Sequence, residues 1–190
     1  ISLDAQLSRA AAYQATVPVF GRGVIFDAPP DKMKTQLKIQ VDALRYQNMK
    51  NYSAIISQEV EDWVAGWGDE GVLDFLDEFL RLTLNTATHC LLGADFRYQL
   101  TDEFRELYHA LEKGLQAIAF VDPYLQQPIF AARDKARERL QELIGGIIAQ
   151  RRAEAGKECG DALETFMART YADGTHLNDN EITGLVIATM

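Results

Sequence analysis

Helical periodicity is the feature of this sequence that most constrains its fold. From Asp31 onward, apolar residues recur every three or four positions in one segment after another, as expected for helices that bury one face. The only strand-like run is Val24-Ile25-Phe26, which is too short to build a sheet. The sequence therefore predicts a mainly α fold.

Caps, glycines and prolines place the ends of the expected helices. Asp31 follows Pro29-Pro30 and opens a helix whose apolar residues are Met33, Leu37, Val41 and Leu44. Asp74 and Gly93 bound a helix that is apolar nearly all round, and such a helix belongs in a core. Further helices are expected at about 53–67, 101–122, 129–153, 163–171 and from 179 onward, with a loop at 156–160.

The two ends of the sequence suggest a fragment of a longer protein. The chain begins at Ile1 without an initiator methionine. Asn178 and Glu181 form a capping-box pattern that opens a last helix, and Met190 lies only about three turns into it. We therefore expect an internal piece of a larger domain.

Charge and cysteine content limit the possible partners and compartment. Of 190 residues, 19 are basic and 28 acidic, which gives a formal net charge of −9, and no basic run offsets it. This balance argues against nucleic acid as a partner. Cys90 and Cys159 form no Cys-x-x-Cys pair, and neither a signal peptide nor a membrane-length apolar run is present. A cytoplasmic location is expected.

The histidines and cysteines give no strong indication of a metal site or a nucleophile. Glu106 and His109 form one Glu-x-x-His motif, but a di-iron site needs a second copy, so we expect His109 to lie partly exposed on a polar face. His89 and Cys90 are neighbours on a helix and point about 100° apart, so a buried thiol beside a hydrogen-bonded imidazole is expected. Cys159 is expected to be an exposed thiol. We predict no catalytic residue and no metal ligand within this chain.

Residues 13–27 have the composition of a ligand-binding loop. They combine the hydroxyl-bearing ring of Tyr13, a rigid Pro18-Val19-Phe20 corner, the closely spaced Gly21 and Gly23, and Asp27. Such a loop brings backbone and aromatic faces close to a ligand. The alternative is that the aromatic residues pack the core.

Lys34 and Lys38 lie four residues apart, on one face of the helix that follows this loop. They are placed to pair with an anionic group near Tyr13. The alternative is a solvated surface pair, in which Lys38 pairs with Asp42.

The loop also resembles that of a known family. Tyr13 followed by Pro18-Val19-Phe20-Gly21-x-Gly23-Val24-x-Phe26-Asp27 is similar to the substrate-recognition loop of the sterol 14α-demethylases, which are cytochrome P-450 enzymes. Further segments resemble the family in the same order: Leu44-Arg45 with Met49-Lys50 (helix C), Leu91-Leu92-Gly93 before Phe96-Arg97 (helix E), 107–112 and 121–125 (helix F and the F–G connector) and 179–190 (start of helix I). The chain thus resembles a bacterial-type member, with the B–C loop at 1–30 and the helical portion at 31–190.

The resemblance implies a function and its residues. It implies a haem-thiolate monooxygenase of sterol biosynthesis that removes the 14α-methyl group of a sterol, using O2 and electrons from a ferredoxin or a reductase. Tyr13 would bind a haem propionate and face the substrate, with Lys34 or Lys38 as the cation beside a propionate. Phe20 would line the substrate cavity, with Leu37 and Ile39 as further candidates, and Tyr124 would lie at the entrance.

Two departures from the family follow from this comparison. Ala15 stands where many relatives carry a bulky apolar residue, which implies an enlarged cavity. The cysteine ligand of the iron and the Glu-x-x-Arg pair would lie beyond Met190, so we expect this piece alone to be inactive. The alternative interpretation is a helical domain that binds an apolar ligand as a sensor or carrier, without redox chemistry.

Overall fold

The structure, a computed structural model, describes residues 10–44, 46–99, 101–154 and 159–190. The helices are α1 (Ala10–Tyr13), α2 (Val17–Phe20), α3 (Pro30–Ala43), α4 (Tyr46–Ala65), α5 (Phe75–Leu92), α6 (Ala94–Gln99), α7 (Thr101–Lys113), α8 (Pro128–Ala153), α9 (Ala162–Ala168) and α10 (Asp179–Thr189). Short 3-10 turns are η1 (Gln14–Thr16), η2 (Ile25–Asp27) and η3 (Ala117–Phe120). Within these described ranges, β-pairing is limited to a single bridge between Thr170 and His176. The prediction of a mainly α fold is confirmed.

Several helix ends agree with the signals in the sequence. Asp74 caps α5 by accepting a hydrogen bond from the backbone N–H of Leu76 at 2.9 Å, and Gly93 ends the helix at a φ of 86°. Asn178 and Glu181 form both hydrogen bonds of the predicted capping box on α10. These ends were predictable because each one depends on residues within a single turn.

Other boundaries differ from the prediction. The helix expected at about 101–122 ends at Lys113, and a separate 3-10 turn follows at η3. Gly114 lies against the buried side chain of Arg133, where an added Cβ would come within 2.8 Å of three Arg133 carbons. The short helix α6 was not predicted, and α4 begins at Tyr46 instead of Ser53. The loop expected at 156–160 lies mostly outside the described residues.

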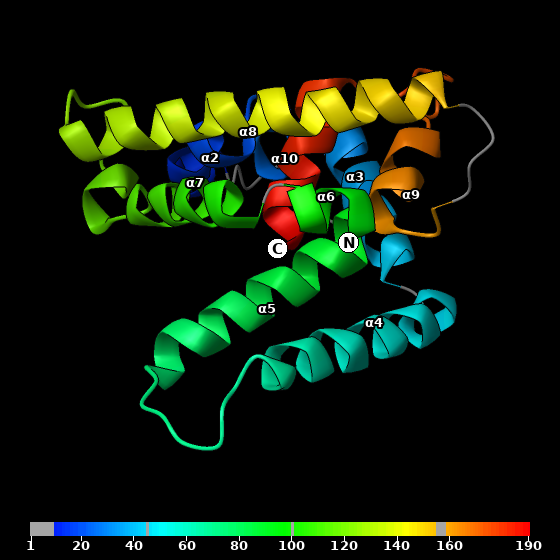
Figure 1. Ribbon diagram of the computed structural model, residues 1–190. Helices are drawn as coiled ribbons and strands as arrows, with labels where there is room; N and C mark the ends of the chain where they lie inside the picture. The colour runs from blue at the N-terminus through cyan, green and yellow to red at the C-terminus, as the bar shows by residue number, and fades with distance from the viewer. Residues whose placement is uncertain (1–9, 45, 100, 155–158) are drawn as a thin grey trace.

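Most of the helices form one layer, and α4 and α5 form a helical hairpin on one side of it (Figure 1). The 26-residue helix α8 runs across the top, with α7 packed alongside it and α10 beneath its middle. The helices α3 and α9 pack together near one end of this layer, and α4 pairs with α5 on the side away from α8. The short elements α2 and η2 lie between α8, α10 and α3.

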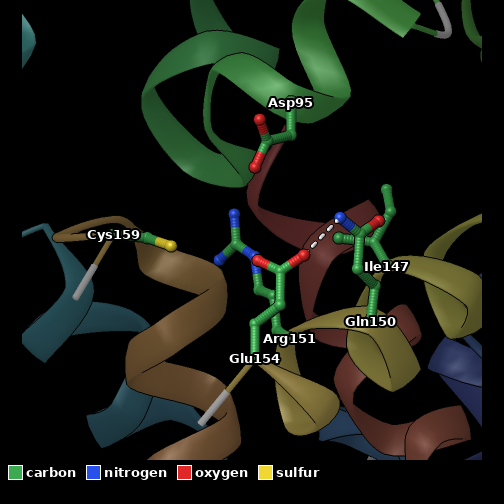
Figure 2. A pocket seen from close by; sticks show the side chains of 6 residues that line it. All are labelled: Asp95, Ile147, Gln150, Arg151, Glu154 and Cys159. Carbon is green, nitrogen blue, oxygen red and sulfur yellow. Dashed lines mark hydrogen bonds between the residues drawn. The ribbon is translucent and has the colours of Figure 1, made fainter. Parts of the chain in front are cut away.

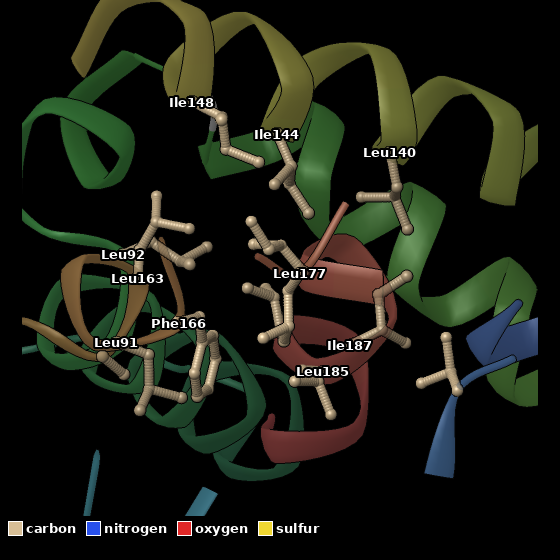
Figure 3. Close-up of a cluster of buried hydrophobic side chains, with 14 of the residues drawn as sticks. Leu91, Leu92, Leu140, Ile144, Ile148, Leu163, Phe166, Leu177, Leu185 and Ile187 are labelled. Atoms are coloured by element: carbon tan, nitrogen blue, oxygen red, sulfur yellow. The ribbon is translucent and has the colours of Figure 1, made fainter. Parts of the chain in front are cut away.

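The main core lies between α8, α9, α10 and the end of α5. Leu140, Ile144 and Ile148 are fully buried and follow one another at four-residue spacing, so they form a single stripe along α8. This stripe faces a cluster that includes Leu92, Leu163, Phe166 and Leu185 from the other helices and Leu177 from the segment before α10 (Figure 3). Complete burial of each such side chain contributes on the order of 1.5–3 kcal/mol to folding.

The prediction that residues 74–93 form a core helix is wrong for the first half of α5. Phe75, Leu76, Phe79 and Leu80 are 50–72% exposed, and burial begins only near the end of the helix, at Thr88 and Cys90–Leu92. The neighbouring α4 also exposes the apolar side chains of Ile56, Val60 and Val64, and Trp67 is exposed just beyond the end of this helix. We call these eight exposed residues the hairpin face. A single partner helix is too narrow to cover a helix that is apolar all round.

Among the described residues, none of the helices is both long enough and apolar enough to cross a membrane.

Candidate functional site

The backbone of the 13–27 loop turns through three residues with positive φ. Gly21 and Gly23 have φ values of 103° and 73°, so the prediction that this glycine pair makes a turn is confirmed. Ile25 has a φ of 47°, which is unfavourable for a β-branched residue and costs on the order of 1–3 kcal/mol. The Asp27 carboxylate closes the turn by accepting a hydrogen bond from Gly23 N–H at 2.6 Å. Val24-Ile25-Phe26 therefore forms part of a tight turn instead of a strand.

Gln36 of α3 holds this strained turn in place. The side chain is completely buried, and its Oε1 accepts a hydrogen bond from Ile25 N–H at 2.5 Å. Its Nε2 donates to the Gly23 carbonyl at 3.0 Å and to the Tyr171 hydroxyl at 2.8 Å. Burial raises the pKa of Tyr171 to about 12, so the hydroxyl stays neutral at physiological pH. Both the oxygen and the nitrogen of the Gln36 amide are thus hydrogen-bonded.

The loop also lies directly against the last helix. An added Cβ at Gly184 of α10 would overlap the Phe20 carbonyl oxygen and come within 2.8 Å of both methyl groups of Val24. Only glycine allows the backbone of the loop to approach α10 this closely. Neither Gln36 nor Gly184 was identified from the sequence. The signal for Gln36 is its spacing, because it lies three and seven residues before Ile39 and Ala43, which are buried on the same face.

The aromatic residues of the loop lie in two different environments, one formed by their own stacking and one at the main core. The Tyr13 and Phe26 rings stack, with centroids 3.7 Å apart and an angle of 18° between the planes. Phe20 is half-buried and packs against the main core. Tyr13 is also half-buried. Both predicted contact residues therefore keep an exposed part, and their roles toward a ligand stay predictions.

The outer face of α3 brings three of the predicted site residues together. Lys34, Leu37 and Lys38 are all exposed, and the next turns of this face continue with Val41 and Leu44. The alternative pairing of Lys38 with Asp42 does not form, because the buried Asp42 carboxylate accepts from Arg169 at 3.1 Å. Across the described ranges, no carboxylate lies within ion-pair distance of either lysine. The two ammonium groups are available to an anionic ligand.

The opposite face of α3 is the buried one. Gln36, Ile39 and Ala43 lie in it, whereas the stripe that includes Leu37, Val41 and Leu44 faces outward. Ile39 is only 3% exposed and belongs to the main core, so the structure does not place it with Leu37. Its predicted contact with a ligand stays a prediction.

Two hollows lie away from this loop. The larger has a volume of about 450 Å³ and lies between α5, α7 and the end of α10, where Leu84, Ala87, Tyr108 and Met190 line it. The smaller has about 10 Å³, room for roughly one water, beside Arg151 and Cys159 (Figure 2). Arg151 there binds the Asp161 carboxylate at 2.7 Å and the Leu92 carbonyl at 2.7 Å, which joins α8 to the ends of α9 and α5.

The predicted histidine environments agree with the structure. His109 is exposed, with Nδ1 3.6 Å from the Glu112 carboxylate. His89 Nδ1 donates to the Glu59 carboxylate at 2.8 Å, and the neighbouring Cys90 is buried. No group of three or more potential metal ligands occurs in the parts of the chain that the structure describes.

Comparison with known families matches residues 3–190 to the family described as cytochrome P450. The chain belongs to the cytochrome P450 family. The resemblance inferred from the loop and the helical segments is thereby confirmed at the level of the family.

The similar curated P450 proteins include sterol demethylases from plants, bacteria and animals. The chain is 38% identical to the sterol 14-demethylase of Arabidopsis thaliana over 187 residues, which cover 98% of this chain and 38% of that protein. It is 40% identical to the sterol 14alpha-demethylase of Mycobacterium tuberculosis over 190 residues, 98% of this chain and 42% of that protein. The lanosterol 14-alpha demethylase of Bos taurus is 32% identical over 176 residues, 92% of this chain and 35% of that protein. The chain thus spans about two fifths of the length of these relatives.

A solved P450 structure supports the same fold. Cyanobacterial CYP120A1 bound to retinoic acid superposes with a TM-score of 0.78 over 92% of this chain and 40% of that one, at 19% sequence identity. At this identity the likeness shows the fold alone. The helices therefore form part of a cytochrome P450 fold.

Membership of the P450 family implies a haem, and the described residues suit one part of it. Lys34 and Lys38 are exposed, unpaired cations next to the Tyr13 loop, and this donor set suits carboxylates such as haem propionates. The cysteines do not suit the iron. Cys90 is 7% exposed, and its burial raises the pKa of the thiol to about 11, so it stays protonated in the core. Cys159 is half-buried in the turn before α9, where its backbone N–H donates to Glu164.

Proposed function

We propose that this chain is part of a sterol 14α-demethylase, a haem-thiolate monooxygenase that oxidatively removes the 14α-methyl group of a sterol. The observation that carries the proposal is the similarity to sterol demethylases, which extends over 98–100% of the chain at 38–40% identity in plant and bacterial relatives. The substrate loop of the enzyme would lie within residues 1–30, and the helical portion would occupy 31–190.

In this proposal, the chain supplies residues that hold the haem and the sterol. Tyr13 donates a hydrogen bond to a propionate, and Lys34 or Lys38 provides the cation that offsets the burial of that carboxylate. The haem, bound through a cysteine from outside this chain, supplies oxygen activation. Phe20 lines the sterol cavity, Leu37 extends it, and Ile39 supports its wall from the core side. O2 and electrons from a ferredoxin or a reductase are the further partners.

Binding a rigid, apolar sterol favours a rigid loop. Gln36 fixes the turn at Ile25, and Gly184 allows the loop to rest on α10, so little loop movement has to be restricted when a ligand binds. Ala15 is completely buried in a small cluster with Ala119 and Phe130, so a larger residue there would shift this part of the loop and change the shape of the sterol site.

The test uses the full-length protein with the substitution Tyr13→Phe. Loss of the hydroxyl removes one hydrogen bond to a charged group, so we expect a several-fold loss of haem retention on dialysis, of sterol turnover, or of both. Formate release measures turnover, and the absorbance of the haem measures retention. The matched control is Tyr98→Phe, which removes the same hydroxyl from an exposed ring of α6 and should change neither quantity.

The same assays separate the enzyme from its main alternative. A non-enzymatic carrier would bind sterols without releasing formate, even with a redox partner and O2 present. If the full-length wild-type protein binds no haem at all, the proposal is overturned and the carrier interpretation replaces it.

A further inference from the structure

We propose that Arg137 and Asn180 form a hydrogen-bonded pair that positions Phe20 and the turn from Gly21 to Gly23, which we call the glycine turn. In this way the pair determines how tightly the sterol is bound. This inference deepens the proposed function and rests on it. Arg137 lies in α8 and Asn180 in the first turn of α10, and the short helix α2 that ends at Phe20 packs against both of these helices (Figure 1). The two residues act through the loop backbone and are positioning residues.

The hydrogen bonds of Arg137 converge on the loop and on α10. Its Nη2 lies 3.1 Å from the Phe20 carbonyl oxygen, 3.0 Å from Asn180 Oδ1 and 3.4 Å from the Asn180 carbonyl oxygen. Its Nη1 donates to Gln141 Oε1 at 3.1 Å, one turn along α8. A single planar guanidinium therefore connects three separate segments.

Asn180 completes the connection from the other side. While its Oδ1 accepts from Arg137, its Nδ2 donates to the Arg22 carbonyl oxygen at 3.0 Å. Gly21 lies between these two contacts, and an added Cβ there would come within 2.7 Å of Asn180 Oδ1 and 2.8 Å of Arg137 Nη2. The pair thus holds the main chain of Phe20 and Arg22 and packs closely against that of Gly21 between them.

Arg137 is a charged residue in a buried position, and the need to fill space does not explain why a charged side chain lies there. The residue is only 7% exposed, and burial lowers its pKa to about 10, so it remains charged at neutral pH. No carboxylate of the described part of the chain pairs with it, and its Nε is buried there without a hydrogen-bond partner. Burying an unpaired cation is costly, and an apolar side chain would fill the same space without that cost. The charged donor is therefore used for its bonds to the loop.

The consequence for binding follows from preorganisation. With the pair intact, the main chain at Phe20 is fixed before the sterol arrives, so binding does not have to order it. Without the pair, the loop samples other positions, and part of the binding free energy is used to restore the original one. Sterol affinity should fall, while haem retention, which depends on other residues of the proposal, should not.

The experiment compares Arg137→Met, Asn180→Ala and the double variant in the full-length haem protein, with Arg139→Met as the matched control. Arg139 lies on the same helix but is exposed, and it binds the surface carboxylates of Glu103 and Glu142. The haem absorbance reports the Kd of a sterol and, separately, the Kd of imidazole, a small ligand of the haem iron that lacks the ring system of a sterol. A second readout is the rate of tryptic cleavage after the exposed Arg22, whose carbonyl Asn180 holds.

We expect each single variant to raise the sterol Kd about tenfold, which corresponds to the loss of one charge-assisted hydrogen bond, and to leave the imidazole Kd unchanged. The double variant should raise the sterol Kd little further, because both residues act on the same short stretch of the loop. Cleavage after Arg22 should become several-fold faster, and Arg137→Lys should restore part of both effects.

An unchanged cleavage rate in both single variants overturns the inference, whatever the sterol result. Equal losses of sterol and imidazole affinity also overturn it, because they indicate general unfolding. If the wild-type protein binds no sterol, the proposed function fails, and the cleavage rates still decide whether the pair holds the loop.

Discussion

The Gln36 amide accepts a hydrogen bond from the backbone N–H of Ile25, and Ile25 is the only non-glycine residue with positive φ in the described part of the chain. A buried side chain on one helix thus holds a strained backbone position eleven residues earlier. Strain of this kind persists only where surrounding contacts enforce it. The shape of the loop is therefore a property of α3 as much as of the loop itself.

Replacing Gln36 by methionine should release this turn. The substitution leaves Ile25 N–H and the Gly23 carbonyl without their partner in a buried position, which should cost about 1–3 kcal/mol of unfolding free energy. Chemical denaturation of the full-length protein measures the loss. Gln58→Met, on the exposed face of α4, is the control and should stay within about 0.5 kcal/mol of the wild type. Equal stabilities of the two variants would contradict the assignment.

Gly184→Ala should push the loop away from α10. The new methyl group overlaps the Phe20 carbonyl, so we expect a loss of about 1–3 kcal/mol together with weaker sterol binding. Gly146→Ala tests the same change in the middle of α8, where nothing lies within 4 Å of an added Cβ. Because alanine has the higher helix propensity, that variant should gain about 0.5–1 kcal/mol. Thermal unfolding of both proteins should show shifts of opposite sign.

Glu59→Gln should weaken the contact between α4, α5 and α6. The Glu59 carboxylate is 4% exposed and binds Arg97 through two nitrogens, at 2.8 and 2.9 Å, as well as His89. Removing its charge weakens the charge-assisted hydrogen bonds to Arg97, with an expected loss of about 1.5–3 kcal/mol in chemical denaturation. Glu61→Gln, on the exposed side of the same helix, should be nearly neutral. A small effect of Glu59→Gln would mean that Arg97 is solvated instead.

The Cys90 thiol should make stability fall at alkaline pH. Its pKa is about 11 in the folded chain against 9.0 for the unperturbed group, so the folded state retains a proton that the unfolded state loses. The contribution is therefore complete below about pH 9 and is lost as pH rises toward 11. Denaturation of wild type and Cys90→Ala across this range should show a steeper fall for the wild type. Parallel curves would contradict the prediction.

The hairpin face should make the 190-residue chain self-associate. Its exposed residues include Leu76 at 72% and Leu80 at 60%, and clustered apolar surface of this kind binds other apolar groups. Sedimentation of the isolated chain should show association that the double variant Leu76→Lys, Leu80→Lys reduces. The control Val72→Lys changes an exposed residue outside the hairpin face and should leave the association unchanged.

Local signals account for the parts of the fold that the sequence predicted. The caps at Asp74 and Asn178 and the periodicity of α8 each depend on residues within a turn or two, so they could be read directly. The buried face of α3 could not be predicted from such local signals. Its apolar residues suggested one face, but the helices packed around α3 bury the face with Gln36 and Ile39. A polar residue in a helix suggests solvent exposure unless its partners are known.

In the candidate site, too, local features could be predicted from the sequence, whereas contacts between distant segments could not. The placement of Lys34 and Lys38 on one face follows from their four-residue spacing, and the structure agrees. The stacking of Tyr13 on Phe26 and the bonds from Arg137 to Phe20 join positions far apart in sequence, and no local pattern encodes them. The shared face of the two lysines was therefore predictable, whereas the residues that hold the loop were not, and the roles of the site residues toward a ligand stay predictions.

The Asn180 bond to the Arg22 carbonyl spans 158 positions of the chain. During synthesis at roughly 5–20 residues per second, the loop leaves the ribosome long before α10 exists. For that interval of about ten seconds or more, the glycine turn has its contacts with Gln36 but lacks the α10 surface that completes its placement. Contacts of such high sequence separation form late and slow the search for the native state. The residues proposed to recognise the sterol are thus made well before the helix that completes their placement.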